Sequence, residues 1–191
     1  MARAGTAERI LDTAERLVQT RGFNGFSYAD IAASLGVTKA SLHYHFPAKA
    51  ELGKRLIGRY EKNFRAALEA IDRAGASAGF GPREKLRRYA GLYARVLRDE
   101  RMCLCGMLAA EYATLPRPMQ KEIRHFFDLN EHWLAGVLEA GRSAGELRFT
   151  GPARALAGVL VGSLEGAMML ARSYGDAARF RAVADRLIAE L

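Results

Sequence analysis

The sequence predicts an all-α protein of about nine helices. Apolar residues recur at three- and four-residue spacing along most of the chain, and no long segment alternates apolar with polar residues as a strand would. Half of the 191 residues are hydrophobic, which is typical of a globular chain that buries a core. No internal repeat is found. The chain therefore has the composition and periodicity of a helical globular protein.

Charge and cysteine content restrict the class of protein further. The formal charge is +8, and residues 1–60 carry nine Lys or Arg against five Asp or Glu, so the first third is the most densely positive. A basic N-terminal domain favours a phosphate-bearing partner. Cys103 and Cys105 do not make a disulfide framework. With no signal-peptide pattern and no apolar run of about 18 residues, we expect a cytoplasmic protein.

The first helix is predicted over residues 7–20. Thr6 is in a position to cap it, and its apolar residues form one stripe. Gly22 follows as the residue most able to adopt a positive φ and end the helix. Phe23 and Phe26 are expected to fill the core of a small three-helix domain.

Two short helices follow, joined by a tight turn. Ser27 and Asp30 have the spacing of a capping box, Gly36 stands in the turn, and Thr38 is placed to cap the second helix. A helix-turn-helix of this kind inserts its second helix into the DNA major groove. The outward positions of that helix carry polar residues, namely Lys39, Ser41, His43 and Tyr44.

The remaining helices are predicted from apolar spacing and from glycine and proline positions. A long helix begins after Pro47, a Gly-, Ala- and Ser-rich loop covers residues 75–81, and Gly145 ends a later helix. The predicted helical ranges are 48–71, 82–101, 103–114, 118–144, 152–174 and 176–191.

The N-terminal third resembles the TetR family of bacterial transcriptional regulators. The matching residues lie between about 6 and 55, and they are Gly22, Phe23, Ser27, Asp30, Ile31, Ala32, Gly36, Val37, Leu42, Tyr44, Phe46, Lys49 and Leu52. The resemblance implies a helix-turn-helix DNA-binding domain at 1–50. It also implies a helical effector-binding and dimerisation domain at 51–191, with DNA, a small molecule and a second copy of the chain as partners.

The resemblance also implies roles in DNA binding for individual residues. Lys39, Ser41 and His43 would face base edges, because a lysine can reach the acceptors of guanine. Tyr44, His45 and Lys49 would hold phosphates, helped by Thr38. The full set of candidate DNA-binding residues is Ser27, Thr38, Lys39, Ala40, Ser41, His43, Tyr44, His45 and Lys49.

Two positions depart from the family pattern, and a metal site is excluded. His43 replaces a frequent tyrosine, so base preference there is not inherited, and Ala40 replaces a frequent glycine with a methyl that could touch thymine. His43 and His45 are two residues apart on a helix and point about 200° from each other, so they cannot share an ion. We expect no metal and no cofactor.

A glycine ribbon marks the candidate dimer interface. Gly158, Gly162 and Gly166 recur every four residues and would let another helix approach closely, either a partner's helix or one of the chain's own. Phe180, Val183 and Leu187 on the last helix complete the candidate interface.

The effector site is expected in the core of the helical domain, where Met, aromatic and occasional polar residues gather. Most of these residues are equally compatible with ordinary core packing. Glu111 and Glu165 are acids on apolar helices, so each needs a partner, either a cationic ligand or an arginine such as Arg124 or Arg172. The candidate ligand-binding residues are Tyr89, Tyr93, Cys103, Met107, Glu111, Phe126, Phe127, His132, Trp133, Met168 and Met169.

The predicted function is ligand-responsive transcriptional regulation, most simply a repressor that a small molecule releases from a palindromic operator. An enzyme is not expected, because the four histidines form no catalytic or metal constellation. Three alternatives remain: an activator of the same fold, a nucleoid-type binder without an effector, and a sensor of electrophiles or oxidants through Cys103 or Cys105. The thiol reading requires a helix that begins between the two cysteines, since a helix N-terminus lowers a thiol pKa.

Overall fold

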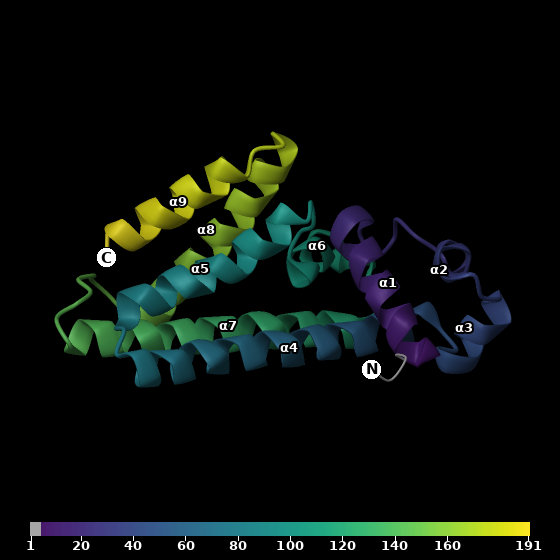
Figure 1. Cartoon of the computed structure of the whole chain (residues 1–191), viewed down its shortest axis with the longest axis horizontal. Coiled ribbons are helices and arrows are strands. Elements are labelled where there is room, and N and C mark those ends of the chain that lie inside the picture. The colour runs from purple at the N-terminus through teal and green to yellow at the C-terminus, as the bar shows by residue number, and fades with distance from the viewer. Residues whose placement is uncertain (1–4) are drawn as a thin grey trace. The chain divides into compact units, whose positions relative to one another are not determined.

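The computed structural model describes residues 5–191, which form nine α-helices and one short 3₁₀ turn and contain no strand (Figure 1). The all-α prediction and the number of helices are confirmed. The helices are α1 (Thr6–Arg21), α2 (Tyr28–Leu35), α3 (Lys39–His45), α4 (Lys49–Ala78), α5 (Pro82–Arg98), α6 (Leu104–Ala110), α7 (Arg117–Ser143), α8 (Ala153–Ser173) and α9 (Ala177–Ala189), with the 3₁₀ turn at Tyr112–Thr114.

The described chain forms two compact units, and their composition differs from the predicted domains 1–50 and 51–191. The N-terminal unit runs to Glu61 and also includes Leu104–Arg124. The second unit, a helical bundle, comprises Lys62–Cys103 and His125–Leu191. The segment containing α6 joins the N-terminal unit because α6 packs against α1. A pairing between segments so far apart in sequence leaves no local signal.

The N-terminal unit has the capped helices that its sequence predicts. The Asp30 carboxylate accepts hydrogen bonds from the backbone N–H and the hydroxyl of Ser27, both at 2.7 Å. Gly36 ends α2 with φ 65° and ψ 36°, the left-handed conformation that favours glycine. One expectation is wrong: Thr6 is the first residue of α1, and Gly5 occupies the N-cap position without a side chain to cap it.

Helix α4 ends seven residues later than predicted. The segment 75–78 continues the helix, and Gly79 (φ 70°) ends it. One helical glycine costs about 1 kcal/mol relative to alanine, and the three residues after Gly75 are Ala, Ser and Ala, so composition does not prevent a helix here. A side chain at Gly75 would crowd Lys85, since an added Cβ would lie 3.0 Å from its Cε. The loop between α4 and α5 is therefore shorter than the predicted segment 75–81. The contact of Gly75 with Lys85 of α5 favours this longer α4.

The bundle core is built by α5, α8 and α9, which pack against one another, with apolar residues from α4 and α7 also buried. Helix α8 buries Val161, Leu164 and Met168 on one side. By length and composition α8 also passes the test for a membrane-spanning helix. That result is weak evidence for a membrane span, because an apolar helix in a core or an interface passes the same test.

A candidate DNA-binding surface and a candidate ligand site

Helix α3 is held by its buried side and exposes the predicted reading side chains. Thr38 caps it, because its hydroxyl oxygen accepts a hydrogen bond from the Ser41 backbone N–H at 3.2 Å. Leu42 is fully buried. Lys39, Ala40, His43 and Tyr44 are exposed, and Tyr44 is 84% exposed, an unusual position for a large aromatic ring. Burial of one face thus fixes the direction in which the other face points.

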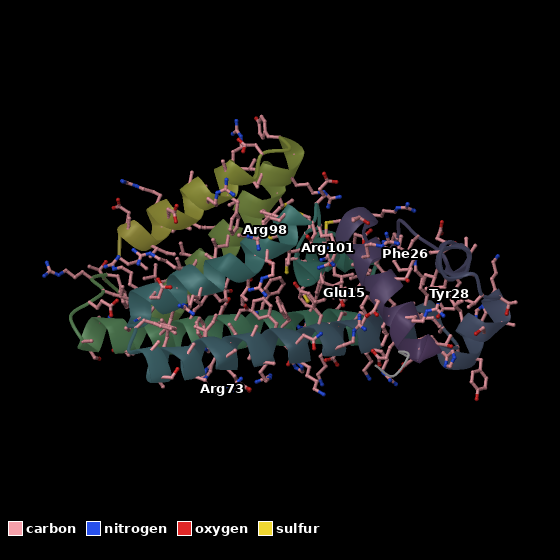
Figure 2. The ribbon with its side chains drawn as sticks, viewed as in Figure 1. Glu15, Phe26, Tyr28, Arg73, Arg98 and Arg101 are labelled. Carbon is pink, nitrogen blue, oxygen red and sulfur yellow. The ribbon has the colours of Figure 1, made fainter. Side chains whose placement is uncertain are left out.

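A shallow hollow on this unit brings together Ser27, Lys39 and His43. The His43 ring packs against the Tyr28 ring, with centroids 4.8 Å apart. Tyr28 is itself fixed, because its hydroxyl donates to the Phe46 carbonyl at 2.8 Å, and burial raises the pKa of Tyr28 to about 12 (Figure 2). Two of the candidate base-reading residues, Lys39 and His43, therefore line the same hollow. His45 is half-buried, and its ring meets the edge of the Tyr44 ring at 5.1 Å.

The Lys49 ammonium group, for which the resemblance implies a phosphate contact, has its partners within the N-terminal unit. This group is half-buried and donates to the carbonyl oxygens of Phe23 and Phe26. The same nitrogen lies over both aromatic rings, 4.5 Å from the centroid of Phe23 and 4.2 Å from that of Phe26. Desolvation lowers the pKa of Lys49, and the nearby charges of Glu111 and Asp30 oppose this effect. Lys49 therefore stabilises the turn between α1 and α2.

Glu111, predicted as a ligand-binding residue, belongs to the N-terminal unit and pairs there with backbone groups. Its carboxylate accepts hydrogen bonds from the backbone N–H groups of Phe23 at 2.6 Å and Asn24 at 3.2 Å. These two donors follow α1 and have no helical partner. Asn24 also donates from its side-chain amide to the Thr114 hydroxyl at 2.9 Å. The acid that seemed unpaired in sequence is paired with backbone groups 87 and 88 residues away.

A second polar cluster ties α4 to α1. Arg59 contacts three acids of α1: Glu8 at 3.2 Å, Asp12 at 2.7 Å and Glu15 at 2.7 Å (Figure 2 labels Glu15). Burial would lower the pKa of Arg59, but hydrogen bonds with Asp12 and Glu15 outweigh it and raise the pKa. Only 19% of the Arg59 side chain is exposed, so screening by water is limited. The start of α4 is therefore attached to the helices that precede it.

In the bundle, aromatic side chains from α4, α5 and α7 form one cluster. Phe64 meets the rings of Tyr89, Tyr93 and Phe126 at centroid distances of 6.1, 6.0 and 5.2 Å. Trp133 stacks on Tyr89 at 5.6 Å. Phe127 continues the cluster from Phe126, 5.5 Å away. These contacts bring together five of the aromatic residues predicted for the ligand site.

A short hydrogen-bond chain crosses this aromatic cluster. The Tyr89 hydroxyl donates to the Asn130 side-chain oxygen at 2.7 Å, and the Asn130 amide donates to the Phe126 carbonyl at 2.7 Å. The hydroxyls of Tyr89 and Tyr93 are 3.1 Å apart. Because the Tyr89 proton is directed at Asn130, Tyr93 donates to Tyr89, and Tyr93 keeps its own acceptor capacity. Burial raises the pKa of Tyr93 well above its usual value.

Glu165 on α8 lies beside this chain. Its carboxylate accepts a hydrogen bond from the Cys103 thiol, and its charge acts on both Tyr89 and Tyr93. One carboxylate oxygen, Oε1, is enclosed and has no hydrogen-bond partner among the described residues. Burial raises the pKa of Glu165 to about 7, while the thiol hydrogen bond partly opposes the shift. An enclosed carboxylate oxygen without a hydrogen-bond partner lowers the free energy of unfolding, so such a group is uncommon unless it has a functional role.

Comparison with known proteins identifies the family. Residues 10–56 match the family model of bacterial regulatory proteins of the tetR family, and residues 82–187 match the tetracyclin repressor-like C-terminal domain. The chain belongs to the TetR family of bacterial transcriptional regulators. Members of this family are DNA-binding regulators and not enzymes. The chain is therefore a DNA-binding transcriptional regulator, as the resemblance implied.

Individual relatives support this assignment over the full chain. A TetR-family regulator from Agrobacterium tumefaciens is 36% identical, with 97% of this chain and 96% of that chain covered and a TM-score of 0.92. A TetR regulator from Legionella pneumophila is 33% identical, covers 98% and 97%, and has a TM-score of 0.88. The biofilm operon icaADBC negative regulator IcaR of Staphylococcus aureus is 40% identical over 65 residues, which is 34% of this chain and 31% of IcaR.

The other residues predicted for the TetR-type ligand site are dispersed. Met107 belongs to the N-terminal unit, whereas His132 and Met169 are exposed on the bundle, Met169 by 56%. Met168 is buried on α8. Trp133, which belongs to the aromatic cluster, is half-buried, and its indole N–H donates to Asp72 at 2.8 Å. An apolar helix face in sequence does not tell which of its residues share a cavity, and that is why the predicted set divides.

The two cysteines are both buried, Cys103 by 99% and Cys105 entirely. Helix α6 begins at Leu104, between them, as the sensor reading required. The neighbour of the Cys103 thiol is nevertheless the Glu165 carboxylate, and an anion does not stabilise a thiolate as a nearby cation would. Enclosure and charge thus both oppose a reactive thiol.

The predicted dimer residues divide between the surface and the core of the single chain. Added Cβ atoms at Gly162 and Gly166 would meet nothing within 4 Å, and at Gly158 only Glu131 comes near, at 3.6 Å. Val183 and Leu187 are half-buried, whereas Phe180 is 1% exposed and packs inside its own chain. Phe180 therefore supports this surface from beneath.

Sequence reasoning missed Asn130 and Phe64 as members of the bundle site. Asn130 is fully buried on α7, and a polar residue on the apolar side of a predicted helix was the available signal. Phe64 is an apolar residue of α4, and nothing in the local sequence indicates that it touches both tyrosines. Among the described residues no cluster of His, Cys, Asp and Glu has the arrangement of a metal site.

Proposed function

We propose that this TetR-family chain is a dimeric repressor that a small molecule releases from DNA. The observation that carries the proposal is the exposed face of α3, on which Lys39, His43 and Tyr44 project from a helix fixed by Thr38 and Leu42. Large or charged groups held in one orientation on a short helix suit a DNA groove better than they suit free solution.

The exposed residues of the N-terminal unit have separate tasks on DNA. Lys39 reaches the O6 and N7 acceptors of guanine, and the Ala40 methyl contacts a thymine methyl. Tyr44 donates to a phosphate, with His45 beside it, and Ser27, Ser41 and His43 complete the protein side of the interface. Lys49 acts indirectly, because it fixes the turn from which α2 and α3 begin.

Repression is supported by the curated relatives. IcaR is named a negative transcriptional regulator, and 65 residues of this chain are similar to it. The chain spans about a third of the length of such relatives, so the mode of regulation remains a proposal. A repressor that binds in the cytoplasm, where bacterial DNA lies, accounts for the basic N-terminal part without a further component.

Dimerisation is supported by the outer side of α8. Val159, Met169 and Leu170 are each more than half exposed, and Gly162 and Gly166 leave open space for a helix of a second copy. Large apolar side chains exposed along one helix are typical of an interface between subunits. Val183 and Leu187 of α9 extend the surface. Two α3 helices related by a twofold axis would read half-sites about 34 Å apart, one turn of DNA.

Ligand release requires that the effector prefers a conformation of the dimer that does not bind DNA. A preference of about 10²-fold corresponds to roughly 2.7 kcal/mol of coupling, which is sufficient for regulation. Helix α4 is suited to transmit such a change, because it begins beside Lys49 and continues as one helix to Ala78. Arg59 attaches its first half to α1.

The experiment that tests this function is selection of binding sites from random double-stranded DNA with the full chain, followed by gel-shift titration. We expect an imperfect palindrome that the protein prefers to random duplex by at least about 10³-fold at fixed salt. Equal affinity for both duplexes would favour a nucleoid-type binder and contradict the proposal. In vitro transcription from a promoter that carries the site then separates repression from activation.

A further inference from the structure

The bundle contains a buried acceptor cluster that no residue of the described chain completes. Glu165 Oε1 is enclosed without a hydrogen-bond partner. The Tyr93 hydroxyl gives its proton to Tyr89, whose own proton goes to Asn130, so the oxygen of Tyr93 also accepts and does not donate outward. The cluster therefore offers two acceptors and lacks donors, and a bound molecule with N–H groups would supply what is missing.

The charge of the cluster selects the kind of molecule. The groups that face Glu165 are the Cys103 thiol and the phenols of Tyr89 and Tyr93, and none of them is a cation. Among the described residues no cation acts on the pKa of the Glu165 carboxyl, so burial disfavours its ionised form. A positively charged ligand would restore ionisation and pair with Oε1. A neutral or anionic ligand would gain much less at this place.

The aromatic and aliphatic side chains near the cluster indicate that the non-charged part of the ligand is apolar. Phe64, Tyr89, Tyr93 and Phe126 form the aromatic contacts already described, and α8 contributes Val161 and Met168, four residues before and three after Glu165. Aromatic faces attract a cation as well as an apolar body. The surroundings thus combine one acid with rings and aliphatic side chains.

We propose that Glu165 anchors the effector of this regulator, and that the effector is an organic cation: a protonated amine or amidine on an aromatic or otherwise apolar body. This inference rests on the proposed function for the existence of an effector. Glu165 Oε1 and the Tyr93 hydroxyl accept from the cationic group, and the Cys103 thiol holds the second carboxylate oxygen in place.

The test uses three probes with a common phenyl body: phenethylamine as the cation, 2-phenylethanol as the neutral compound and 3-phenylpropionate as the anion. Binding to the full chain without DNA is followed by the melting temperature and by fluorescence of Trp133, the one tryptophan, which stacks on Tyr89. We expect the amine to bind at least tenfold more tightly than either of the other compounds.

Two variants assign the preference to Glu165. In Glu165→Gln the preference for the amine should fall below twofold. The matched control is Glu69→Gln, which removes an exposed carboxylate of the same unit and should leave the preference unchanged. An undiminished preference in Glu165→Gln would overturn the proposal, and so would tighter binding of the alcohol or the anion in the wild-type chain.

A measurement on the wild-type chain makes the test independent of whether the variant folds. Because Glu165 has a pKa of about 7, part of the population is protonated at pH 6.5, and an amine that pairs with the carboxylate must displace that proton. Calorimetry in two buffers of different ionisation enthalpy should show proton release with phenethylamine and none with 2-phenylethanol. Amine binding without proton release would contradict the pairing.

The experiments distinguish failure of the cationic-effector proposal from failure of the proposed repressor function. Selective DNA binding with no preference for the amine would refute the cationic effector and leave the repressor intact. A chain that prefers the amine through Glu165 but binds no specific DNA would support the cation site and refute the repressor function.

Discussion

The two units of this protein differ in how they meet their charged side chains. Each unit encloses one side-chain atom without a hydrogen-bond partner among the described residues, Arg59 Nε in the N-terminal unit and Glu165 Oε1 in the bundle. In the N-terminal unit, however, the charges of Lys49, Glu111 and Arg59 each meet several backbone groups or opposite charges. In the bundle, the Asn130–Tyr89–Tyr93 chain ends beside an acid whose one hydrogen-bond donor is the Cys103 thiol. A charge with several partners is held in one conformation, whereas an acid with few partners leaves free energy to be gained on binding.

The difference suits the two tasks that we propose. A surface that reads DNA benefits from side chains that hold one geometry before binding, since less conformational entropy is then lost on the complex. A site that responds to a ligand needs a state that the ligand completes and so favours. Four predictions break or sharpen this contrast, and they are ordered by the size of the expected effect.

Replacement of Lys49 by methionine should have the largest effect. The variant Lys49→Met loses two charge-assisted hydrogen bonds and two ring contacts, so we expect the free energy of unfolding in urea to fall by about 3 kcal/mol. The control Lys54→Met removes an exposed lysine and should change it by less than about 0.5 kcal/mol.

The same pair of variants tests whether Lys49 binds a DNA phosphate or only stabilises the N-terminal unit. A lysine that binds phosphate contributes about 0.9 to the slope of log K against log salt concentration. We expect Lys49→Met to keep the wild-type slope even where its affinity for the operator is lower. A slope reduced by about 0.9 would show that Lys49 does contact a phosphate of the operator.

The effect of pH on stability should reveal Glu165. The folded-state pKa of about 7 is raised above the ordinary value of 4.5, so this group favours folding most at pH values below about 4.5. That contribution is lost as pH rises toward 7. Relative to the wild type, Glu165→Gln should therefore gain about 3 kcal/mol of stability between pH 4.5 and pH 8. Parallel stability curves for the two proteins would show that Glu165 is ordinarily solvated.

Conservative replacement of Arg59 should show whether its stabilising effect comes from several directed hydrogen bonds or from its positive charge alone. Arg59→Lys keeps the positive charge but cannot reach Asp12 and Glu15 with separate nitrogens, so we expect a loss of about 1.5 kcal/mol in the free energy of unfolding. Arg55→Lys, an exposed position on the same helix, is the comparison and should be neutral. Equal effects at both positions would make the Arg59 cluster an ordinary surface ion pair.

Removal of the Tyr44 ring should affect DNA binding alone. Because Tyr44 is 84% exposed, Tyr44→Ala should change the unfolding free energy by less than about 0.5 kcal/mol. Operator affinity in a gel-shift titration should fall about tenfold, which corresponds to about 1.4 kcal/mol. Unchanged affinity in a variant of unchanged stability would remove Tyr44 from the interface.

Much of the N-terminal unit was predictable because its signals are local. Ser27 with Asp30, Gly36 and Thr38 act over three or four residues, and the structure has each of them in the expected place. The periodicity of apolar residues likewise predicted nine helices, with errors mainly at ends such as that of α4. Local hydrogen bonds and helix caps depend on neighbours in sequence, so sequence suffices to find them.

The sequence by itself thus determined the all-α class, the helix-turn-helix and the family. Only the tertiary structure decided what each polar side chain meets. Glu111 and Glu165 look alike in sequence, as acids on apolar helices, yet one pairs with backbone groups of Phe23 and Asn24 and the other keeps an unpaired oxygen. The physical reason is that burial and hydrogen bonding depend on segments that are far apart in sequence, 87 and 88 residues in the case of Glu111, and no spacing along the chain records such pairs.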